Sequence, residues 1–169
     1  GVNKKPTVVK GFITPPTSLE PVGIGRDVTC LALSKDLSIV VSATIARIVR
    51  VWEFEETSME VQFKFHQAEV TDVCILAPYP VAASCDSNGW VYLYAVRPSV
   101  LKNHCIYKFQ NVTMPINKPC GVFSITFSPT NCYLFTGDES GDVKVWPLAE
   151  LFEQLGIKAL ETKEARAKR

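Results

Sequence analysis

A nucleophile and a base are the first residue types to look for in this sequence, and its cysteines and histidines are the first candidates. It has six cysteines and two histidines, His66 and His104. A Cys–His pair can act as a nucleophile and its base. However, all the cysteines except Cys105 and Cys120 lie in the middle of predicted strands, and no third group is placed to orient a histidine. We therefore expect free thiols of a buried core and no catalytic residues.

Metal and cofactor motifs are also incomplete. No two cysteines have the CxxC spacing of a zinc site. Gly23-Ile24-Gly25 begins like a dinucleotide loop but lacks the third glycine and a following strand–helix unit. Asp86-Ser87-Asn88-Gly89 begins like a calcium loop but lacks the distal glutamate, and Asn-Gly is a strong hairpin signal. We interpret both motifs as turns and predict neither a metal nor a cofactor.

Three segments of the chain resemble one another: Val28–Phe54, Val70–Val96 and Val122–Leu148. Each begins with an alternating apolar run, which is typical of a strand with two different faces. A polar turn, a short run of small and β-branched residues, a second polar turn and a third run follow. The sequence therefore predicts three copies of one antiparallel unit.

The aromatic residue near the end of each third run gives the period of the repeat. Trp52 and Tyr94 are 42 residues apart, and Tyr94 and Trp146 are 52 residues apart. A four-stranded propeller blade has a period of about 40–45 residues. We place the extra residues of the second interval in 97–121, which contains three prolines.

The first two units are each followed by a candidate fourth strand, at Val61–Phe65 and Cys105–Phe109. After Trp146 the apolar residues follow a helical spacing instead, and Gly156 is placed to end the helix. Thr7–Ile13 reads as a strand that could be the outer strand of a neighbouring blade. The predicted organisation is an N-terminal strand and linker (1–27), three blades (28–148), and a C-terminal helix with a charged tail (149–169).

The third runs, IVRVWEF, WVYLYAV and DVKVWPL, resemble the strand of WD40 repeats that ends in Trp-Asp. This resemblance implies an all-β fold, a partial WD40 β-propeller of about three four-stranded antiparallel blades with a short C-terminal helix. The run from TIARIVRVWEF to VWPLAELFEQLGI also resembles the long WD-repeat proteins of cilia and flagella, some of which carry EF-hands.

The resemblance also implies a buried polar network. In the family, a histidine before the first strand reaches a serine in the second strand and an acidic residue in the next turn. Only the second repeat keeps this histidine, as His66, and Ser84 with either Asp86 or Asn88 could complete the network.

The other two repeats depart from that pattern. Ala46 in the first repeat and Ser140 in the third are expected to replace the turn aspartate, while Trp52 and Trp146 keep the aromatic position. A buried polar network stabilises a fold when it is complete. We therefore expect these two blades to rely on apolar packing.

The function that the resemblance implies is a non-catalytic scaffold for other proteins, in a fragment of a larger WD40-repeat protein. Binding residues concentrate in loops on a rigid framework. On one face these loops would present Arg26, Asp27, Arg47, Glu69, Asn88, Lys118, Asp138 and Glu139.

Two alternatives remain at this point. One is a propeller-type hydrolase, for which the sequence offers no convergent set of titratable groups. The other is binding of nucleic acid or an acidic partner by the basic C-terminal tail. The formal net charge of +1 gives no reason to expect a general nucleic-acid surface.

A propeller usually has four to eight blades. Three blades leave an apolar flank at each end, so we expect self-association through these flanks. No apolar run approaches the roughly 20 residues that span a membrane. No signal peptide is visible and the cysteines suit a reducing compartment. We expect an intracellular, cytoplasmic protein, or a ciliary or cytoskeletal one if the narrower resemblance holds.

Overall fold

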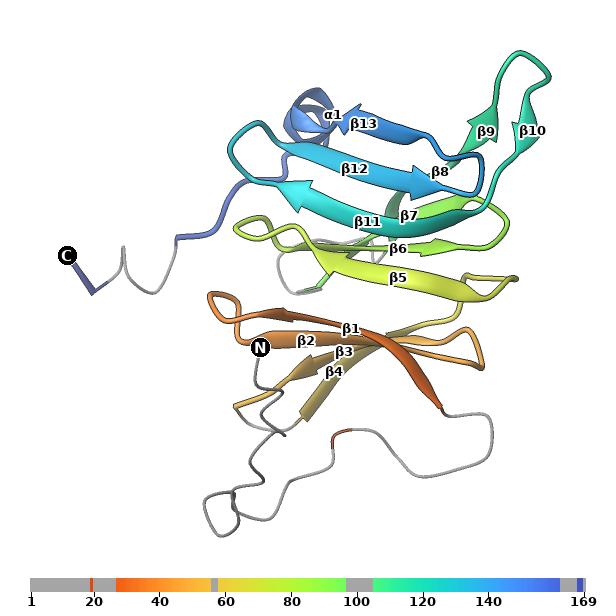
Figure 1. Ribbon diagram of the computed structural model, residues 1–169. Coiled ribbons are helices and arrows are strands. Elements are labelled where there is room, and N and C mark those ends of the chain that lie inside the picture. Colours follow the sequence, from red (N-terminus) through yellow and green to blue (C-terminus); the bar gives the residue numbers. More distant parts are fainter. Residues whose placement is uncertain (1–18, 20–26, 56–57, 97–104, 162–166, 169) are drawn as a thin grey trace, which may run out of the picture.

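The computed structural model describes residues 19, 27–55, 58–96, 105–161 and 167–168. Most of them form three stacked antiparallel sheets, which we call the first, second and third blades (Figure 1). The first blade contains β1 (Val28–Ser34), β2 (Ile39–Thr44), β3 (Val49–Glu53) and β4 (Ser58–Phe63). The second contains β5 (Val70–Ile75), β6 (Val81–Asp86), β7 (Trp90–Ala95) and β8 (Cys105–Gln110). The third contains β11 (Val122–Ser128), β12 (Tyr133–Asp138) and β13 (Val143–Pro147).

The strands of each blade are paired in sequence order, and the blades share a detail of register. The first strand pairs with the second through a shift near its start, at Val28/Cys30, Val70/Asp72 and Val122/Ser124. A β-bulge of this kind bends a strand and raises its twist. The same irregularity at the same place in all three sheets confirms that they are copies of one unit.

The blades pack face to face, with the inner strands β1, β5 and β11 side by side. Val41, Val49 and Val51 of the first blade are buried against the second blade. The rings of Phe63 and Tyr94 lie 4.3 Å apart in this interface. A single sheet cannot bury its own faces, so each core belongs to two neighbouring blades.

The interface between the second and third blades is built in the same way. It contains Leu93 and Leu134, and the rings of Phe109 and Trp146 have centroids 4.3 Å apart. In both interfaces, aromatic and aliphatic side chains of one blade therefore pack against those of the next blade.

The third blade has three strands among the described residues, and α1 (Ala149–Leu155) follows β13 in place of a fourth. Its Phe152 is buried and lies 4.9 Å from the ring of Tyr79 in the second blade. Gly156 ends the helix with φ 68°, as predicted. The chain then turns back along the second blade, where the N–H of Leu160 donates to the carbonyl of Pro78 at 2.8 Å.

Some predicted boundaries change. The fourth strand of the first blade is Ser58–Phe63 and not Val61–Phe65. Part of the extra length before the third blade forms a small hairpin, β9 (Val112–Thr113) and β10 (Lys118–Pro119), which the sequence pattern did not predict. Thr7–Ile13 lies outside the described residues. No helix within the described ranges is long and apolar enough to cross a membrane.

Both ends of the stack expose apolar side chains. On the outer face of the third blade, Val143 is 75% exposed and Val145 is 48% exposed. On β1 of the first blade, Leu31 and Leu33 are 65% and 66% exposed. These two surfaces, which we call the flanks, are where further blades would stack.

Candidate binding face

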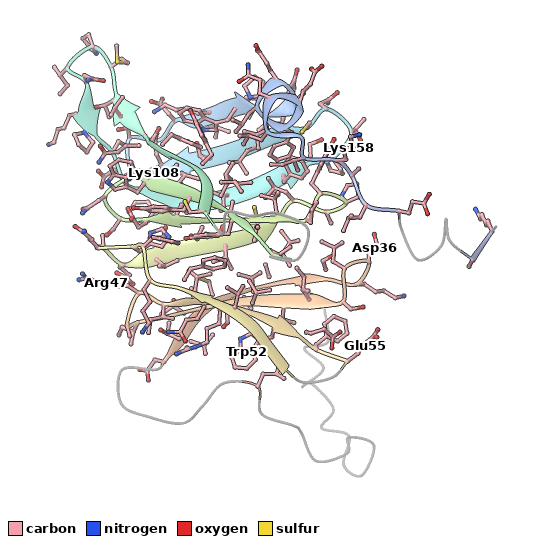
Figure 2. The ribbon with its side chains drawn as sticks, turned by 180° about the vertical axis from the view of Figure 1, so that it is seen from behind. Asp36, Arg47, Trp52, Glu55, Lys108 and Lys158 are labelled. Atoms are coloured by element: carbon pink, nitrogen blue, oxygen red, sulfur yellow. The ribbon has the colours of Figure 1, made fainter. Side chains whose placement is uncertain are left out.

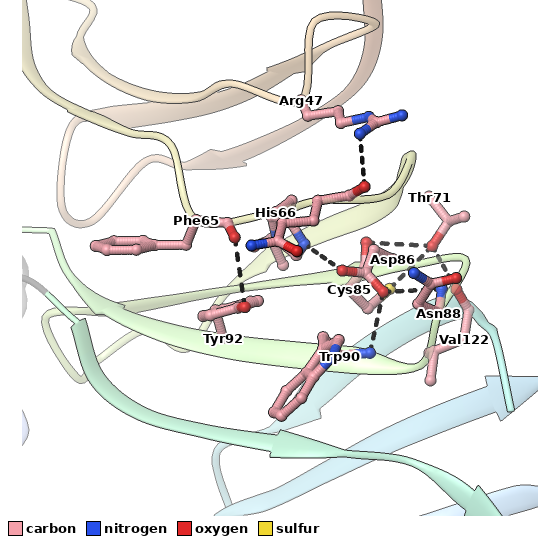
Figure 3. A network of polar contacts seen from close by, with 12 residues as sticks. Arg47, Phe65, His66, Thr71, Cys85, Asp86, Asn88, Trp90, Tyr92 and Val122 are labelled. Carbon is pink, nitrogen blue, oxygen red and sulfur yellow. Dashed lines mark hydrogen bonds and ion pairs between the residues drawn. The ribbon is translucent and has the colours of Figure 1, made fainter. Parts of the chain in front are cut away.

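One end of the stack carries the turns between the second and third strands of each blade and the connections that lead into β5 and β11. We call this end the turn face. The guanidinium of Arg47 donates to the carbonyl of Gln67 at 2.5 Å (Figure 3). The N–H of Ser87 donates to the carbonyl of Glu69 at 3.0 Å. These bonds fix the turns relative to one another and across the first interface between blades.

The predicted binding residues divide into those that the structure exposes and those that it does not. Arg26 lies outside the described residues. Side chains that are exposed around the turn face are Asp27, Arg47, Glu69, Asn88, Lys118 and Glu139. Figure 2 shows Arg47 on one side of the molecule and Asp36, Glu55 and Lys158 on the opposite side.

The predicted place of Asp138 on the binding surface is corrected, because its carboxylate is fully buried and cannot contact a partner. It accepts hydrogen bonds from the side-chain amide of Asn111 at 3.0 Å and from the N–H of Ser140 and Asp142. The ammonium of Lys144 lies 3.2 Å away. Desolvation alone would raise the pKa of the Asp138 carboxyl, but these donors outweigh it and the pKa lies below its usual value.

In the second blade the structure brings His66, Ser84 and Asp86 together. His66 Nδ1 lies 2.8 Å from Asp86 Oδ2, and His66 Nε2 lies 2.5 Å from Ser84 Oγ. Tyr94 extends the network to Ser84. Burial raises the pKa of Tyr94, so its hydroxyl stays protonated and can donate. One chain of donors then satisfies every group: Tyr94 to Ser84, Ser84 to His66, and His66 to Asp86.

This arrangement has the order of a Ser–His–Asp triad. However, Ser84 is 0% exposed and so is the His66 side chain. The Ser84 hydroxyl is already bonded to both Tyr94 and His66. A substrate has no route to the serine oxygen, and the network can hold the blade together but cannot attack an ester.

The acidic position of the network is Asp86 and not Asn88. It is the last residue of β6 and faces Val70 across the sheet. The residues in the same register are Thr44 in the first blade and Asp138 in the third. The predicted replacements, Ala46 and Ser140, were therefore wrong by two residues.

The third blade keeps a buried polar network, contrary to the prediction of apolar packing. Asn111 takes the role of His66 and donates to Asp138. The Asn111 side-chain oxygen accepts from Lys144 Nζ at 2.6 Å. The sequence analysis missed Asn111, which lies 11 residues before Val122, whereas His66 lies four before Val70.

In the described part of the first blade, Thr44 stands where the other two blades have the buried carboxylate. The buried hydroxyl of Thr44 has no hydrogen-bond partner within the described part of the chain. A hydroxyl in the second strand still meets an aromatic side chain in the third, as in the other blades. Trp52 Nε1 donates to Ser42 Oγ at 3.0 Å, and Trp146 Nε1 donates to Thr136 Oγ1 at 2.8 Å. The constant spacing of ten residues, shared by Ser84 and Tyr94, was the signal that could have identified Ser42 and Thr136.

All six cysteines are free, as predicted. Burial raises the pKa of the Cys85 thiol to about 12 and also raises that of Cys74. A thiol is a poor nucleophile when its pKa is raised. Within the described ranges, no group of three or more His, Cys, Asp or Glu side chains could hold a metal ion.

Stacked antiparallel blades that share one register irregularity and one hydroxyl–aromatic contact define a β-propeller repeat protein. The family model of the WD domain, G-beta repeat, matches residues 20–53 and 110–147, which include β1 to β3 of the first blade and all of the third blade. Two segments of the chain match WD40 repeats, and its fold is that of a partial WD40 propeller.

A search for related proteins found Pre-mRNA-processing factor 19 of Caenorhabditis elegans. It is 29% identical over 128 residues, which is 75% of this chain and 24% of the relative. The chain thus spans about a quarter of the length of the relative that it matches. WD40 repeats and this relative support a role in protein interaction.

Proposed function

We propose that this chain is a non-catalytic scaffold, part of a larger WD40-repeat protein, that binds a protein partner through its turn face. The main support is that exposed residues from separate turns and connections converge there. Asp27, Arg47 and Glu69 come from different segments and lie beside hydrogen bonds that fix those segments. A rigid display of loop residues is what binding proteins use.

The two alternatives have less support. The hydrolase hypothesis gains no support from the Ser84–His66–Asp86 network, because Ser84 and His66 are buried. The basic tail extends largely beyond the described residues, and binding through it stays a hypothesis. The relative's name concerns pre-mRNA processing, but we take from it only the interaction role, since the match covers a small part of that protein.

Charge reversal on opposite faces tests the proposal. Arg47→Glu combined with Glu69→Arg changes the turn face, and Asp36→Arg changes an exposed turn on the opposite side (Figure 2). Proteins captured by each variant from a cell extract would be quantified by mass spectrometry. We expect the turn-face variant to lose partners that the Asp36→Arg control keeps. Equal retention by both variants would refute binding through the turn face.

We further propose an intracellular location, in the cytoplasm or, if the narrower resemblance to ciliary proteins holds, in a ciliary or cytoskeletal structure. Fluorescence microscopy of the tagged chain in ciliated cells tests this. We expect cytoplasmic or axonemal signal, and accumulation in the nucleus would contradict it.

A further inference from the structure

A small pocket lies on the turn face of the second blade, beneath the connection between β4 and β5, and its volume is about 190 Å³. We propose that this pocket binds the carboxylate side chain of a glutamate or aspartate in a protein partner. The inference rests on the proposed scaffold function and names the chemistry of one contact. Residues that carry the argument are Gln67, Asn88, Lys108, Trp90, Tyr92 and Asp86.

Three donor groups that line the pocket lack acceptors. The side-chain amides of Gln67 and Asn88 make no hydrogen bond within the described part of the chain, where only their backbone groups are bonded. The ammonium of Lys108 lies 5.5 Å from the centroid of the Trp90 ring and forms no ion pair with a described carboxylate. A carboxylate can accept from several donors at once, and charge-assisted bonds are the stronger ones.

The pocket does not suit a cation, although it contains a carboxylate and aromatic rings. Asp86 Oδ2 is bonded to His66, and Asp86 Oδ1 accepts from the N–H of Asn88 at 2.9 Å and of Trp90 at 3.0 Å (Figure 3). The Asp86 side chain is only 1% exposed. Lys108 already occupies the cation–π position beside Trp90. A second cation would meet the like charge of Lys108, and the carboxylate of the pocket is already bonded.

The size of the pocket favours a single side chain over a free small molecule. Small-molecule pockets are commonly about 300–1,000 Å³. The rings of Trp90 and Tyr92 would cover the methylene groups of a glutamate, while its carboxylate meets the three donors. The turn is held in place, because Gln110 Nε2 donates to the Asn88 carbonyl at 3.1 Å. Arg47 and Lys108 lie on the same side of the molecule and add positive charge there (Figure 2).

Indole N–H signals in nitrogen-15 NMR spectra of the full chain test this inference. The chain has three tryptophans. The Trp52 and Trp146 N–H groups are bonded internally to Ser42 and Thr136, and these signals serve as internal controls. The probes are capped pentapeptides, Ac-Gly-Gly-Glu-Gly-Gly-NH₂ and its analogues with glutamine or lysine at the centre.

We expect the glutamate peptide to shift the Trp90 signal saturably and to leave Trp52 and Trp146 in place. The glutamine peptide should bind roughly tenfold more weakly, because it loses a charge-assisted hydrogen bond. Lys108→Met keeps an extended apolar stem, and its affinity for the glutamate peptide should also fall roughly tenfold. Unchanged Trp52 and Trp146 signals would show that the variant is folded.

The inference is overturned if the glutamate peptide leaves Trp90 unshifted, if the lysine peptide binds as well, or if Lys108→Met binds normally. Failure here is distinct from failure of the proposed function. If charge reversal of the turn face abolishes partner capture but the glutamate peptide does not bind, the scaffold proposal is supported and only the proposed carboxylate pocket is refuted. If the turn-face variant still captures the same partners, binding through the turn face is itself refuted.

Discussion

At the scale of single residues, the three blades fill one buried polar position in three ways. In the second blade a histidine pairs with Asp86, and in the third an asparagine pairs with Asp138. In the first blade Thr44 occupies the position of the acidic residue. A buried carboxylate is costly unless it is paired and hydrogen-bonded. The first blade has Thr44 in place of the carboxylate, which avoids a buried unpaired charge at this position.

The second-blade network gives a prediction about stability. His66→Ala leaves Asp86 and Ser84 without a shared partner, and should lower the free energy of unfolding by roughly 1–3 kcal/mol. His66→Asn is the matched control, since an amide can donate to Asp86 as Asn111 does to Asp138. It should cost less than the alanine variant. Urea denaturation measures both, and an unchanged midpoint for His66→Ala would show that the network contributes nothing.

The sequence could predict part of this network and not the rest. His66 and Ser84 were identifiable because the second repeat keeps a histidine and a serine in the order in which WD40 repeats have them. Asp138 was assigned to the surface, because the composition of a turn does not show which acidic residue ends the preceding strand. Asn111 was hidden by the inserted hairpin, which lengthens the distance to β11.

At the scale of elements, the turns between second and third strands need a residue in the left-handed region. Gly89 has φ 86° and Gly141 has φ 87°, and Arg47 occupies the corresponding place with φ 64°. Glycine adopts this conformation without the steric cost of a Cβ. At Gly89 a second constraint applies, since a Cβ there would lie 2.4 Å from the carbonyl oxygen of Cys120.

Two alanine substitutions separate these constraints. At Gly141 nothing lies within 4 Å of an added Cβ, so Gly141→Ala should cost only the backbone strain, about 1–2 kcal/mol. Gly89→Ala should cost distinctly more, because Cys120 and Asn111 present backbone atoms that must move. Thermal denaturation compares the two variants. Equal decreases in melting temperature would mean that the second and third blades pack less closely at this turn than the structure shows.

The strands themselves were largely predictable, because a period of two with polar turns is a local signal. The helix at Ala149–Leu155 was predictable for the same reason, with a period near 3.6 and a glycine stop. The β9–β10 hairpin was not, since its strands have two residues each and carry no periodicity. The return of the chain along the second blade depends on long-range packing of Phe152 on Tyr79, which no local pattern encodes.

At the scale of the whole molecule, the repeat period predicted the number of blades, and the resemblance to WD40 repeats predicted that the blades stack. The consequence is an open arc with an apolar flank at each end. Val143 and Val145 lie on one flank and Leu31 and Leu33 on the other, and each is about half exposed or more. Contiguous exposed apolar surface of this kind is typical of an interaction site. Two such arcs joined head to tail would have six blades, within the usual range of four to eight.

The mass of the chain in solution tests the open arc most directly, by light scattering after size exclusion. The chain has a mass of 18.7 kDa. We predict a dimer of twice that mass, which Val143→Glu with Val145→Glu converts to a folded monomer, while Lys35→Glu on an exposed turn leaves it intact. A wild-type chain that stays monomeric at high concentration would contradict the account, because its flanks would then not be available for association.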